Sequence, residues 1–481
     1  MIIFEDLTCG YTASPILQRI NWTIKEGEHW VVTGPMASGK TTLVNTIMGK
    51  TRKLSGCIRY TYLNNPSSYE ERKKTIHFVS FTDTGKLFDS VNAVHYYQQR
   101  YQAFDSDGHL TVRGYLKEGG LNEQDPDHLE FIDLMNLRPL LDMERIKLSS
   151  GQTRKILLCK AFLGQPKFLL LDNPHIGLDD PSRHLFNNYL DKLVIHFNQQ
   201  IILSGHFRSL PSCINRQLML KEGKITYSGP RVYEKPIEKI KLKDPGKIVE
   251  QFQNKRDQNF STILKFDHIQ IKYGKNEVIK SLNWEVKAGD KWLVEGPNGA
   301  GKSTIISLIY GDHPQAYSNK ITLFDQKRGQ GESIWDIKKR IGFTSPELHS
   351  YFNYNHPAEE VVLSGYSDTL FVQHRKEIKP ILSDLLFDYF DITSYKKIPF
   401  KELSTGLQRV LFFIRALVKA PSVLLLDEPY QGMDQATVQK CNLLLKNILT
   451  PAHTLIFISH FRDEVPGIID KILKLDHFDP K

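Results

Sequence analysis

The sequence predicts an α/β protein made of two tandem copies of one domain, each with helices around a mostly parallel sheet. Three observations predict this fold: the chain repeats itself over a long period, each copy carries a glycine-rich turn between an apolar strand and a helix, and each copy carries a further apolar strand that ends in a carboxylate. The 481 residues suit two large domains or about three of ~150 residues. Because 40% of the residues are hydrophobic and 24% are charged, the composition excludes a long disordered or collagen-like chain.

The net charge bears on which partners the protein could bind, and the cysteine content bears on the compartment in which it works. Lys and Arg number 63 against 54 Asp and Glu, a net charge of +9 that permits attraction to nucleic acid, nucleotide or an anionic membrane without choosing among them. The sequence shows no clear nucleic-acid-binding element. Five cysteines, odd in number and without a CxxC pair, predict reduced thiols. No apolar run approaches the ~18 residues of a membrane span, so we expect a cytoplasmic protein, or one peripheral at the inner face of a membrane beside a separate partner.

The internal repeat sets the domain organisation. Tyr11 recurs as Tyr273, 262 residues later (273 − 11), and the run LSSG at 148–151 recurs as LSTG at 403–406, 255 residues later (403 − 148). A period this long indicates duplicated domains rather than a solenoid. We expect one domain over 1–229, a charged linker with three prolines and no sustained apolar face over 230–261, and a second domain over 262–481.

The same elements are expected in the same order in both copies. Three short strands come first, then a glycine-rich turn, then a helix that stops at Gly49 in one copy and Gly311 in the other. Two almost purely apolar strands follow in each copy, as expected for buried parallel strands. The predicted strands are 2–7, 17–24, 30–33, 168–171 and 201–203 in the first copy, and 263–269, 282–286, 292–295, 423–426 and 455–458 in the second.

Two phosphate-binding loops are the strongest functional signal. Residues 34–41 (GPMASGKT) and 296–303 (GPNGAGKS) both satisfy GxxxxGK[ST], and both lie between an apolar strand and a helix, as the motif requires. Glycines let backbone N–H groups surround the phosphates, the lysine reaches their oxygens, and the hydroxyl of Thr41 or Ser303 is a ligand for Mg²⁺. The residues expected to bind ATP here are Gly34, Ser38, Gly39, Lys40, Thr41 and Thr42, and Gly296, Asn298, Gly299, Gly301, Lys302, Ser303 and Thr304.

Each further apolar strand ends in a carboxylate. Asp172 and Asp427 are placed to hold the Mg²⁺ shell, and the residue that follows differs between the copies. Glu428 can act as the base that activates water, whereas the amide of Asn173 cannot take a proton. A strand-end Asp alone is often a cap, but here its spacing recurs with the loop. We therefore expect Glu428, with Lys302, to be catalytic.

A serine-rich turn and a histidine also recur. Taken singly, such a turn is more commonly a helix N-cap, and a histidine at a strand end is more commonly structural. The repeated spacing favours contact with the γ-phosphate, with His460 catalytic and His206 binding nucleotide. The expected turn residues, which face the opposite copy's phosphate, are Ser149, Ser150, Gly151 and Gln152, and Ser404, Thr405 and Gly406.

With these parts in this order, the chain resembles the ATP-binding cassette (ABC) ATPases, with both cassettes on one polypeptide. The resemblance implies Walker A loops at the lysines, Walker B strands at the aspartates, signature motifs at the serine-rich turns, D-loops at Asp179 and Asp434, and an antiparallel β and a helical subdomain in each cassette. It implies that Tyr11 and Tyr273 stack on adenine. It also implies head-to-tail pairing within one chain, so that the monomer contains both ATP sites.

The segment 311–319 (GDHPQAYSN) together with 333–340 (SIWDIKKR) is similar to the ModF-type tandem ATPases, which implies the ATP-binding component of a transport system with a separate permease. Two features depart from the family pattern. The Q-loop glutamine is absent, because Ser80 and Ser345 stand in its region, and Asn173 replaces a carboxylate.

Two alternatives to a transport ATPase stay open. One is a soluble ABC-F-like translation- or ribosome-associated ATPase, against which the linker of about 30 residues counts, because a helical hairpin drawn from it would have arms of only ~22 Å. The other is a nucleotide-gated regulatory module that is not coupled to a permease. The sequence names no transported solute.

Overall fold

The computed structural model describes residues 1–63, 69–81, 111–144, 148, 150–232, 243–253, 260–273, 276–297, 299–346, 348, 355–368 and 380–475. The described residues up to Val232 form one compact unit, and those from Lys243 onward form a second. Each unit is an α/β domain with its own apolar core. The predicted fold class is confirmed, whereas the domain boundaries at 229 and 262 stay predictions.

The core of the first unit is a six-stranded sheet in the order β5-β6-β7-β3-β8-β9, in which neighbours are parallel except β8 and β9. The register places Asp172 beside Ser80 on one side and Ser204 on the other. Both β6 and β7 are buried throughout, as their apolar sequences predict. The strands are β3 (Trp30–Thr33), β5 (Ile76–Ser80), β6 (Phe168–Asp172), β7 (Gln200–Ser204), β8 (Arg216–Lys221) and β9 (Lys224–Pro230).

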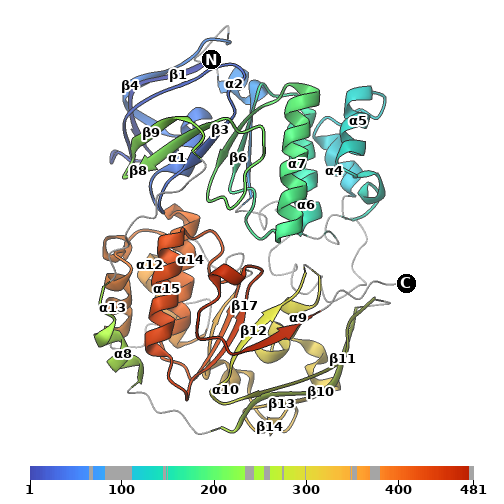
Figure 1. Ribbon diagram of the computed structural model, residues 1–481, viewed down its shortest axis with the longest axis vertical. Helices are drawn as coiled ribbons and strands as arrows, with labels where there is room; N and C mark the ends of the chain where they lie inside the picture. Colours follow the sequence, from blue (N-terminus) through green and yellow to red (C-terminus); the bar gives the residue numbers. More distant parts are fainter. Residues whose placement is uncertain are drawn as a thin grey trace. The chain divides into compact units, whose positions relative to one another are not determined.

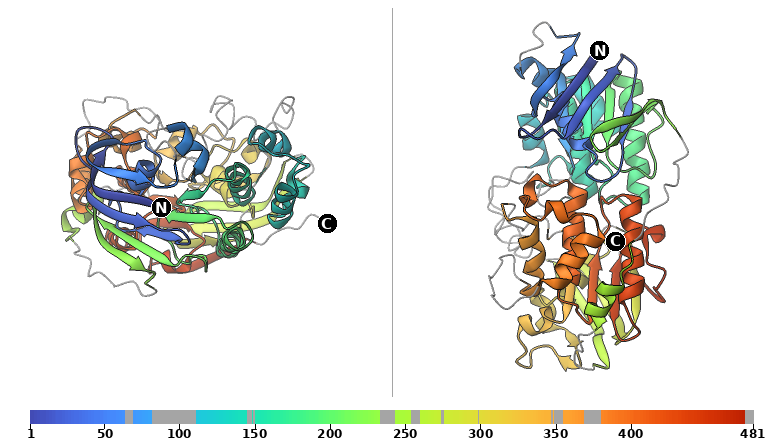
Figure 2. Two further views of the ribbon diagram at one scale, coloured as in Figure 1. Left: turned by 90° about the horizontal axis from the view of Figure 1, so that it is seen from above. Right: turned by 90° about the vertical axis from the view of Figure 1, so that its left-hand side faces the viewer.

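An antiparallel sheet and a group of helices complete the first unit, on opposite sides of its core sheet (Figures 1 and 2). The antiparallel sheet has the order β2-β1-β4, with β1 (Ile2–Gly10), β2 (Leu17–Ile24) and β4 (Arg52–Tyr60). The helices α4 and α5 pack against α6. The helices are α1 (Lys40–Ile47), α2 (Tyr69–Thr75), α4 (Val112–Glu118), α5 (Pro126–Leu134), α6 (Ser150–Leu163) and α7 (Asp180–Phe197), with a 3-10 turn η2 (Arg138–Leu140).

The second unit repeats this plan. Its core sheet has the order β15-β16-β17-β12-β18, all parallel, and its antiparallel sheet has the order β11-β10-β13-β14. The core strands are β12 (Lys291–Glu295), β15 (Ile341–Thr344), β16 (Val423–Asp427), β17 (Thr454–Ile458) and β18 (Lys471–Lys474). The antiparallel strands are β10 (Thr262–Tyr273), β11 (Asn276–Lys287), β13 (Lys320–Leu323) and β14 (Gln326–Lys327).

Helices α12 and α13 pack against α14 and form the helical part of the second unit (Figure 1). The remaining helices border the core sheet. The helices are α9 (Lys302–Ile309), α10 (Ile334–Lys338), α12 (Ala358–Leu363), α13 (Ile381–Tyr389), α14 (Thr405–Leu417) and α15 (Gln435–Ile448). The 3-10 turns are η4 (Pro314–Ser318), η5 (Ser364–Tyr366), η6 (Thr393–Tyr395), η7 (Phe400–Glu402) and η8 (Arg462–Glu464).

One part of the predicted linker is structured. Residues Gly246–Gln253 form helix α8, which packs against α13 and α15 of the second unit. Ile248 and Phe252, four positions apart on one face, are buried, and the Phe252 ring centroid lies 5.3 Å from that of His453. Two side chains one turn apart thus give this helix a short apolar face within the segment that was expected to be a linker without a sustained one.

Two further expectations concern the whole sequence. All five cysteines are free thiols, in agreement with the prediction of reduced cysteines. None of the helices in the described ranges has both the length and the hydropathy of a membrane span.

Candidate functional site

The glycine-rich loop of each unit ends in a helix whose first N–H groups are uncapped. Gly39 precedes α1 with φ +100° and Gly301 precedes α9 with φ +89°, both in the left-handed region, and neither helix has a side-chain cap. At Gly34, a Cβ would lie 2.1 Å from the carbonyl oxygen of Leu220. Only glycine fits these positions, so the backbone N–H groups of the loop stay available for an anion.

Both loop lysines take the same pose. The Nζ of Lys40 donates to the carbonyl oxygens of Gly34 (2.9 Å) and Pro35 (2.8 Å). The Nζ of Lys302 does the same in the second unit, at 2.6 and 2.9 Å from the carbonyl oxygens of Gly296 and Pro297. Each ammonium group therefore lies over its own loop, where a phosphate chain bound by that loop would meet it.

A buried hydroxyl supports the assignment of the first loop. The side chain of Ser38 is 2% exposed, and its Oγ has no hydrogen-bond partner in the described structure. A buried hydroxyl without a partner is costly unless a ligand satisfies it. Of the other predicted loop residues, Thr42 and Thr304 are buried, Ser303 and Gly299 are exposed, and Asn298 lies outside the described residues.

The carboxylate of Asp172 is surrounded by donors in the first unit. Thr41 Oγ1 donates to its Oδ2 at 3.1 Å, while the Oδ1 accepts from the Ser204 hydroxyl and, at 3.2 Å, from Asn173 Nδ2. Burial raises the pKa of Asp172, and these hydrogen bonds act in the opposite direction. A hydroxyl and a carboxylate oxygen this close together are the hard oxygen ligands that Mg²⁺ prefers, so the residues fit the ion.

In the second unit, the residue after the strand-end aspartate is a largely buried glutamate that faces a histidine. Glu428 follows the buried Asp427, and its Oε1 lies 3.4 Å from His460 Nε2 without a hydrogen bond. Burial, together with the neighbouring charge of Asp427, raises the pKa of Glu428 to about 8. A carboxyl group with a pKa near neutrality can hold or release a proton at working pH.

Asn173 and Glu428 occupy the same backbone turn. Their φ angles are +52° and +45°, and their N–H groups donate to the carbonyl oxygens of Ser204 (2.7 Å) and Ile458 (2.9 Å). The two units therefore differ in side-chain chemistry at this position and share the backbone. Left-handed φ is uncommon for glutamate and marks a position held by its surroundings.

The aromatic and signature residues are placed as follows. Tyr11 is 49% exposed, and its hydroxyl accepts from Asn45 Nδ2 at 2.7 Å, so the ring stands on the surface near α1. The side chain of Tyr273, at the end of β10, lies outside the described residues. Ser404 is the N-cap of α14 and accepts from the N–H of Leu407 at 3.4 Å.

The remaining predicted residues are only partly described. Gly406 is buried, and Thr405, Gln152 and His206 are half-buried. Ser149 lies outside the described residues. Helix α6 begins at Ser150, and the surroundings of Ser150 and Gly151 are not described.

The predicted D-loop aspartates are helix caps. Asp179 accepts from the N–H of Ser182 at 3.0 Å and starts α7, and Asp434 accepts from the N–H of Thr437 at 2.7 Å and starts α15. In the Q-loop region, Ser345 is buried, and its Oγ accepts from the N–H of Leu348 at 3.4 Å.

Sequence reasoning missed one arginine in each signature helix. Arg154 of α6 donates to the carbonyl oxygen of Ile176, and Arg409 of α14 donates at 2.9 Å to Oε1 of Gln431. Both arginines are buried, and each joins the signature helix to the loop after the Walker B strand of its own unit. The signal was present, because Arg154 and Arg409 are separated by the repeat period of 255 residues (409 − 154).

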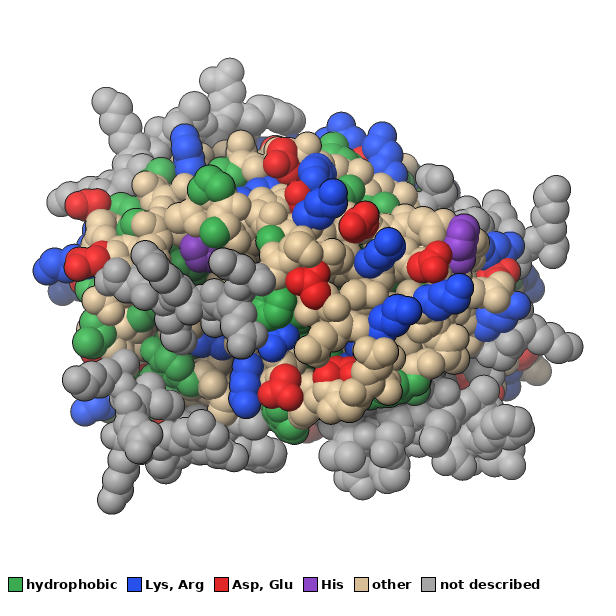
Figure 3. Space-filling model, turned by 90° about the horizontal axis from the view of Figure 1, so that it is seen from below, with side chains coloured by type: hydrophobic (Ala, Val, Ile, Leu, Met, Phe, Trp, Pro, Cys, Tyr) green, Lys and Arg blue, Asp and Glu red, His purple; other side chains and the backbone are tan. Residues whose placement is uncertain are grey.

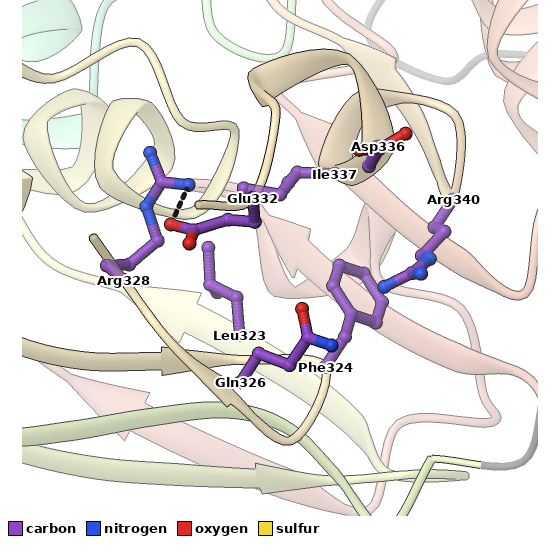
Figure 4. A pocket seen from close by; sticks show the side chains of 8 residues that line it. All are labelled: Leu323, Phe324, Gln326, Arg328, Glu332, Asp336, Ile337 and Arg340. Carbon is purple, nitrogen blue, oxygen red and sulfur yellow. Dashed lines mark hydrogen bonds and ion pairs between the residues drawn. The ribbon is translucent and has the colours of Figure 1, made fainter. Parts of the chain in front are cut away.

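A pocket of about 200 Å³ lies in the second unit, between β13, β14 and α10, and none of its lining residues belongs to the phosphate-binding loop (Figure 4). Arg328 and Glu332 face each other at one end, with Nη1 and Oε1 2.8 Å apart. Arg340 lies over the Phe324 ring at the other end. Because Glu332 already neutralises Arg328, that guanidinium group is engaged within the protein.

The described part of the face drawn in Figure 3 has no large basic patch to which a polyanion could bind. Lys and Arg side chains alternate there with Asp and Glu, and within the described atoms of that view no large patch of one sign is formed. Binding to nucleic acid needs a clustered basic surface.

Each α/β unit has an uncapped phosphate loop after one core strand, a carboxylate at the end of the next strand but one in the sheet, and a histidine just beyond the strand that lies between them. Together these features define a P-loop ATPase of the ABC type. The sequence profile of the ABC transporter family matches residues 17–175 and 279–431. The chain belongs to this family and is an ATP-binding ATPase with two cassettes in tandem.

Relatives that match along almost their whole length share this organisation. The chain is 30% identical over 474 residues to an uncharacterised ABC transporter ATP-binding protein of Schizosaccharomyces pombe, covering 96% of this chain and 95% of that protein. It is 30% identical over 475 residues to the ABC transporter ATP-binding protein ModF of Escherichia coli, covering 94% and 92%. A solved archaeal ribosome recycling factor, aABCE1, in complex with the stalk protein aP1, is similar in fold, with TM-score 0.55 and 16% identity over 98% of this chain and 87% of that one.

Proposed function

We propose that the two cassettes form an intramolecular head-to-tail pair that binds two Mg²⁺–ATP and hydrolyses ATP at the site built on the second cassette's phosphate loop. The observation that carries the proposal is the contrast at one backbone turn. Glu428 presents a buried carboxyl group beside His460, whereas Asn173 presents an amide that is hydrogen-bonded to Asp172.

The residues that would hold Mg²⁺ are Thr41 with Asp172 and Ser303 with Asp427. Bound Mg²⁺ supplies charge that neutralises the phosphate oxygens during transfer to water. Thr41 and Asp172 already lie within hydrogen-bond distance of each other. Lys40 and Lys302 would exchange their loop carbonyl partners for phosphate oxygens, which are stronger acceptors for an ammonium group.

At the second-cassette site, Glu428 would accept the proton of the attacking water at its carboxylate. Burial and the neighbouring charge of Asp427 raise the pKa of this carboxyl group, which makes its carboxylate a stronger base. His460, 3.4 Å from Oε1, would orient that carboxylate and contact the γ-phosphate. The signature motif of the first cassette, residues 148–152, would complete this site.

At the first-cassette site, no group at position 173 can take a proton. Asn173 Nδ2 is committed to Asp172, and an amide is not a base in water. Together with the signature motif at Ser404, Thr405 and Gly406, this site would bind ATP and hold it through many turnovers of the other site.

We further propose a cytoplasmic ATPase that is peripheral to a membrane and powers a separate permease. The name of the Escherichia coli relative supports a transport role, as does the match to the ABC transporter family. The test is fractionation of cell lysate with Mg²⁺–ATP and the Glu428→Gln variant. Recovery with membrane vesicles supports the transport role, whereas recovery with ribosomes supports a translation-linked ATPase and overturns it.

A further inference from the structure

The two cassettes differ at three neighbouring positions around the end of the Walker B strand. The strand register and the matching backbone hydrogen bonds pair these positions, since Asp172 lies beside Ser204 and Asp427 lies beside Ile458. The first cassette has Asn173, Ser204 and Gly205 where the second has Glu428, Ile458 and Ser459.

Two of the three first-cassette residues bind the same carboxylate oxygen. The Ser204 hydroxyl and Asn173 Nδ2 both donate to Oδ1 of Asp172. A carboxylate only accepts hydrogen bonds, so the amide of Asn173 must turn its nitrogen toward Asp172 and its oxygen away. Ile458 could supply no such hydroxyl in the second cassette.

The third residue makes room for the amide oxygen. A Cβ at position 205 would lie 2.6 Å from Oδ1 of Asn173 and 3.3 Å from its Cα. Gly205 also has φ +142°, which a side chain rarely allows. In the second cassette the serine at this place, Ser459, accepts from the N–H of Phe461 at 3.0 Å.

We infer that Ser204 and Gly205 are positioning residues that fix Asn173 as a hydrogen-bond donor to Asp172, so that the first-cassette site is built to hold nucleotide rather than being a hydrolytic site with one residue lost. This inference rests on the proposed function. A carboxylate in the pose of Asn173 would place an oxygen about 3.2 Å from Asp172 Oδ1, and two carboxylates at that distance repel each other. Restoring the acidic residue alone should therefore damage the site.

The experiment uses the full chain with Glu428→Gln, in which the second site should bind ATP without hydrolysing it. Binding of radiolabelled ATP with Mg²⁺ is measured by equilibrium dialysis, and phosphate release is measured in parallel. Adding Asn173→Asp, which is isosteric, should weaken the first site at least tenfold. The triple variant adds Asn173→Glu, Ser204→Ile and Gly205→Ser to the Glu428→Gln chain. It should bind ATP at both sites and hydrolyse ATP at least tenfold faster than the Glu428→Gln chain.

Two single variants keep the test independent of whether the triple variant folds. Ser204→Ala removes one donor and should weaken the first site three- to tenfold, whereas Ser55→Ala, at an exposed position of β4, should leave binding unchanged. Undiminished binding in Asn173→Asp overturns the inference, and so does a folded triple variant that hydrolyses no faster than the chain with Asn173→Glu alone. Failure of the proposed function looks different, because the unmodified chain would then lack turnover or Glu428→Gln would retain it.

Discussion

At the scale of single residues, one backbone turn carries the difference between the two sites. Glu428 has φ +45°, and a non-glycine residue in the left-handed region costs on the order of 1–3 kcal/mol. Asn173 takes the same turn with φ +52°, which asparagine tolerates more readily because its short amide bonds locally. The second cassette therefore retains a strained glutamate where a relaxed residue is possible, as the proposed catalytic role of Glu428 would require.

Glu428→Gln should lower steady-state ATP hydrolysis by about 10²- to 10⁴-fold, because the amide has the same shape but cannot take a proton from water. Phosphate release under saturating Mg²⁺–ATP measures this effect. Glu118→Gln, at an exposed position of α4, is the matched control and should keep full activity. If Glu428→Gln kept half of the activity, the assignment of one working site and one holding site would be wrong.

Replacing Lys40 or Lys302 by Ala should reduce the ATP stoichiometry from two toward one. Each ammonium group lies over its own loop, so its removal deprives one site of a charge and leaves the other site intact. Equilibrium dialysis counts the bound nucleotide, with Lys224→Ala on exposed β9 as the control. Two full-affinity sites in Lys302→Ala would contradict the role of the second loop.

At the scale of elements, the repeat period and the apolar patterns were enough to predict the three central strands of each core sheet but not the strands that flank them. The predicted strands 17–24 and 30–33 match β2 and β3, and the strands that end at Asp172 and Asp427 are each found with their carboxylate. Contacts that depend on side-chain direction could not be predicted. Nothing in the sequence shows that Arg154 reaches the carbonyl oxygen of Ile176, because the partner is backbone on another element.

Helix α8 is one of the elements that the sequence analysis did not predict, and it attaches the end of the linker to the second cassette. Lys243, just before it, forms ion pairs with Asp388 (3.0 Å) and Asp391 (2.9 Å). These pairs are solvent-exposed and contribute little to stability. The buried Phe252 and Ile248 must therefore supply most of the attachment.

Phe252→Ala should detach α8 without unfolding the cassette. Loss of a fully buried phenylalanine costs about 3–5 kcal/mol, and opening of this short helix exposes mainly that residue and Ile248. Amide hydrogen exchange over 246–253 should accelerate about 10²-fold or more, while β16 stays protected. Glu250→Ala on the exposed face of α8 is the control, and equal exchange in both variants would show that Phe252 does not anchor the helix.

At the scale of the whole molecule, the anchored α8 shortens the connection between the cassettes. Only ten residues, 233–242, lie between Val232 and Lys243, and the 11 Cα–Cα steps across them span at most about 36 Å when extended. A short connection keeps the local concentration of one cassette around the other in roughly the millimolar range. Pairing within one chain should therefore win over pairing between chains at ordinary protein concentrations.

Light scattering of the Glu428→Gln chain with Mg²⁺–ATP should accordingly show a species of one chain mass, 55.4 kDa, at micromolar protein. Nucleotide that is bound but not hydrolysed favours pairing of the two cassettes. The short connection keeps the partner cassette of the same chain nearby, so a second chain is unnecessary. Small-angle scattering should then show a more compact monomer with ATP than without it, and Lys40→Ala with Lys302→Ala should abolish that compaction because neither site binds nucleotide. A species of twice the chain mass, with no compact monomer, would mean that the cassettes pair between chains and that the connection through 233–242 does not permit closure.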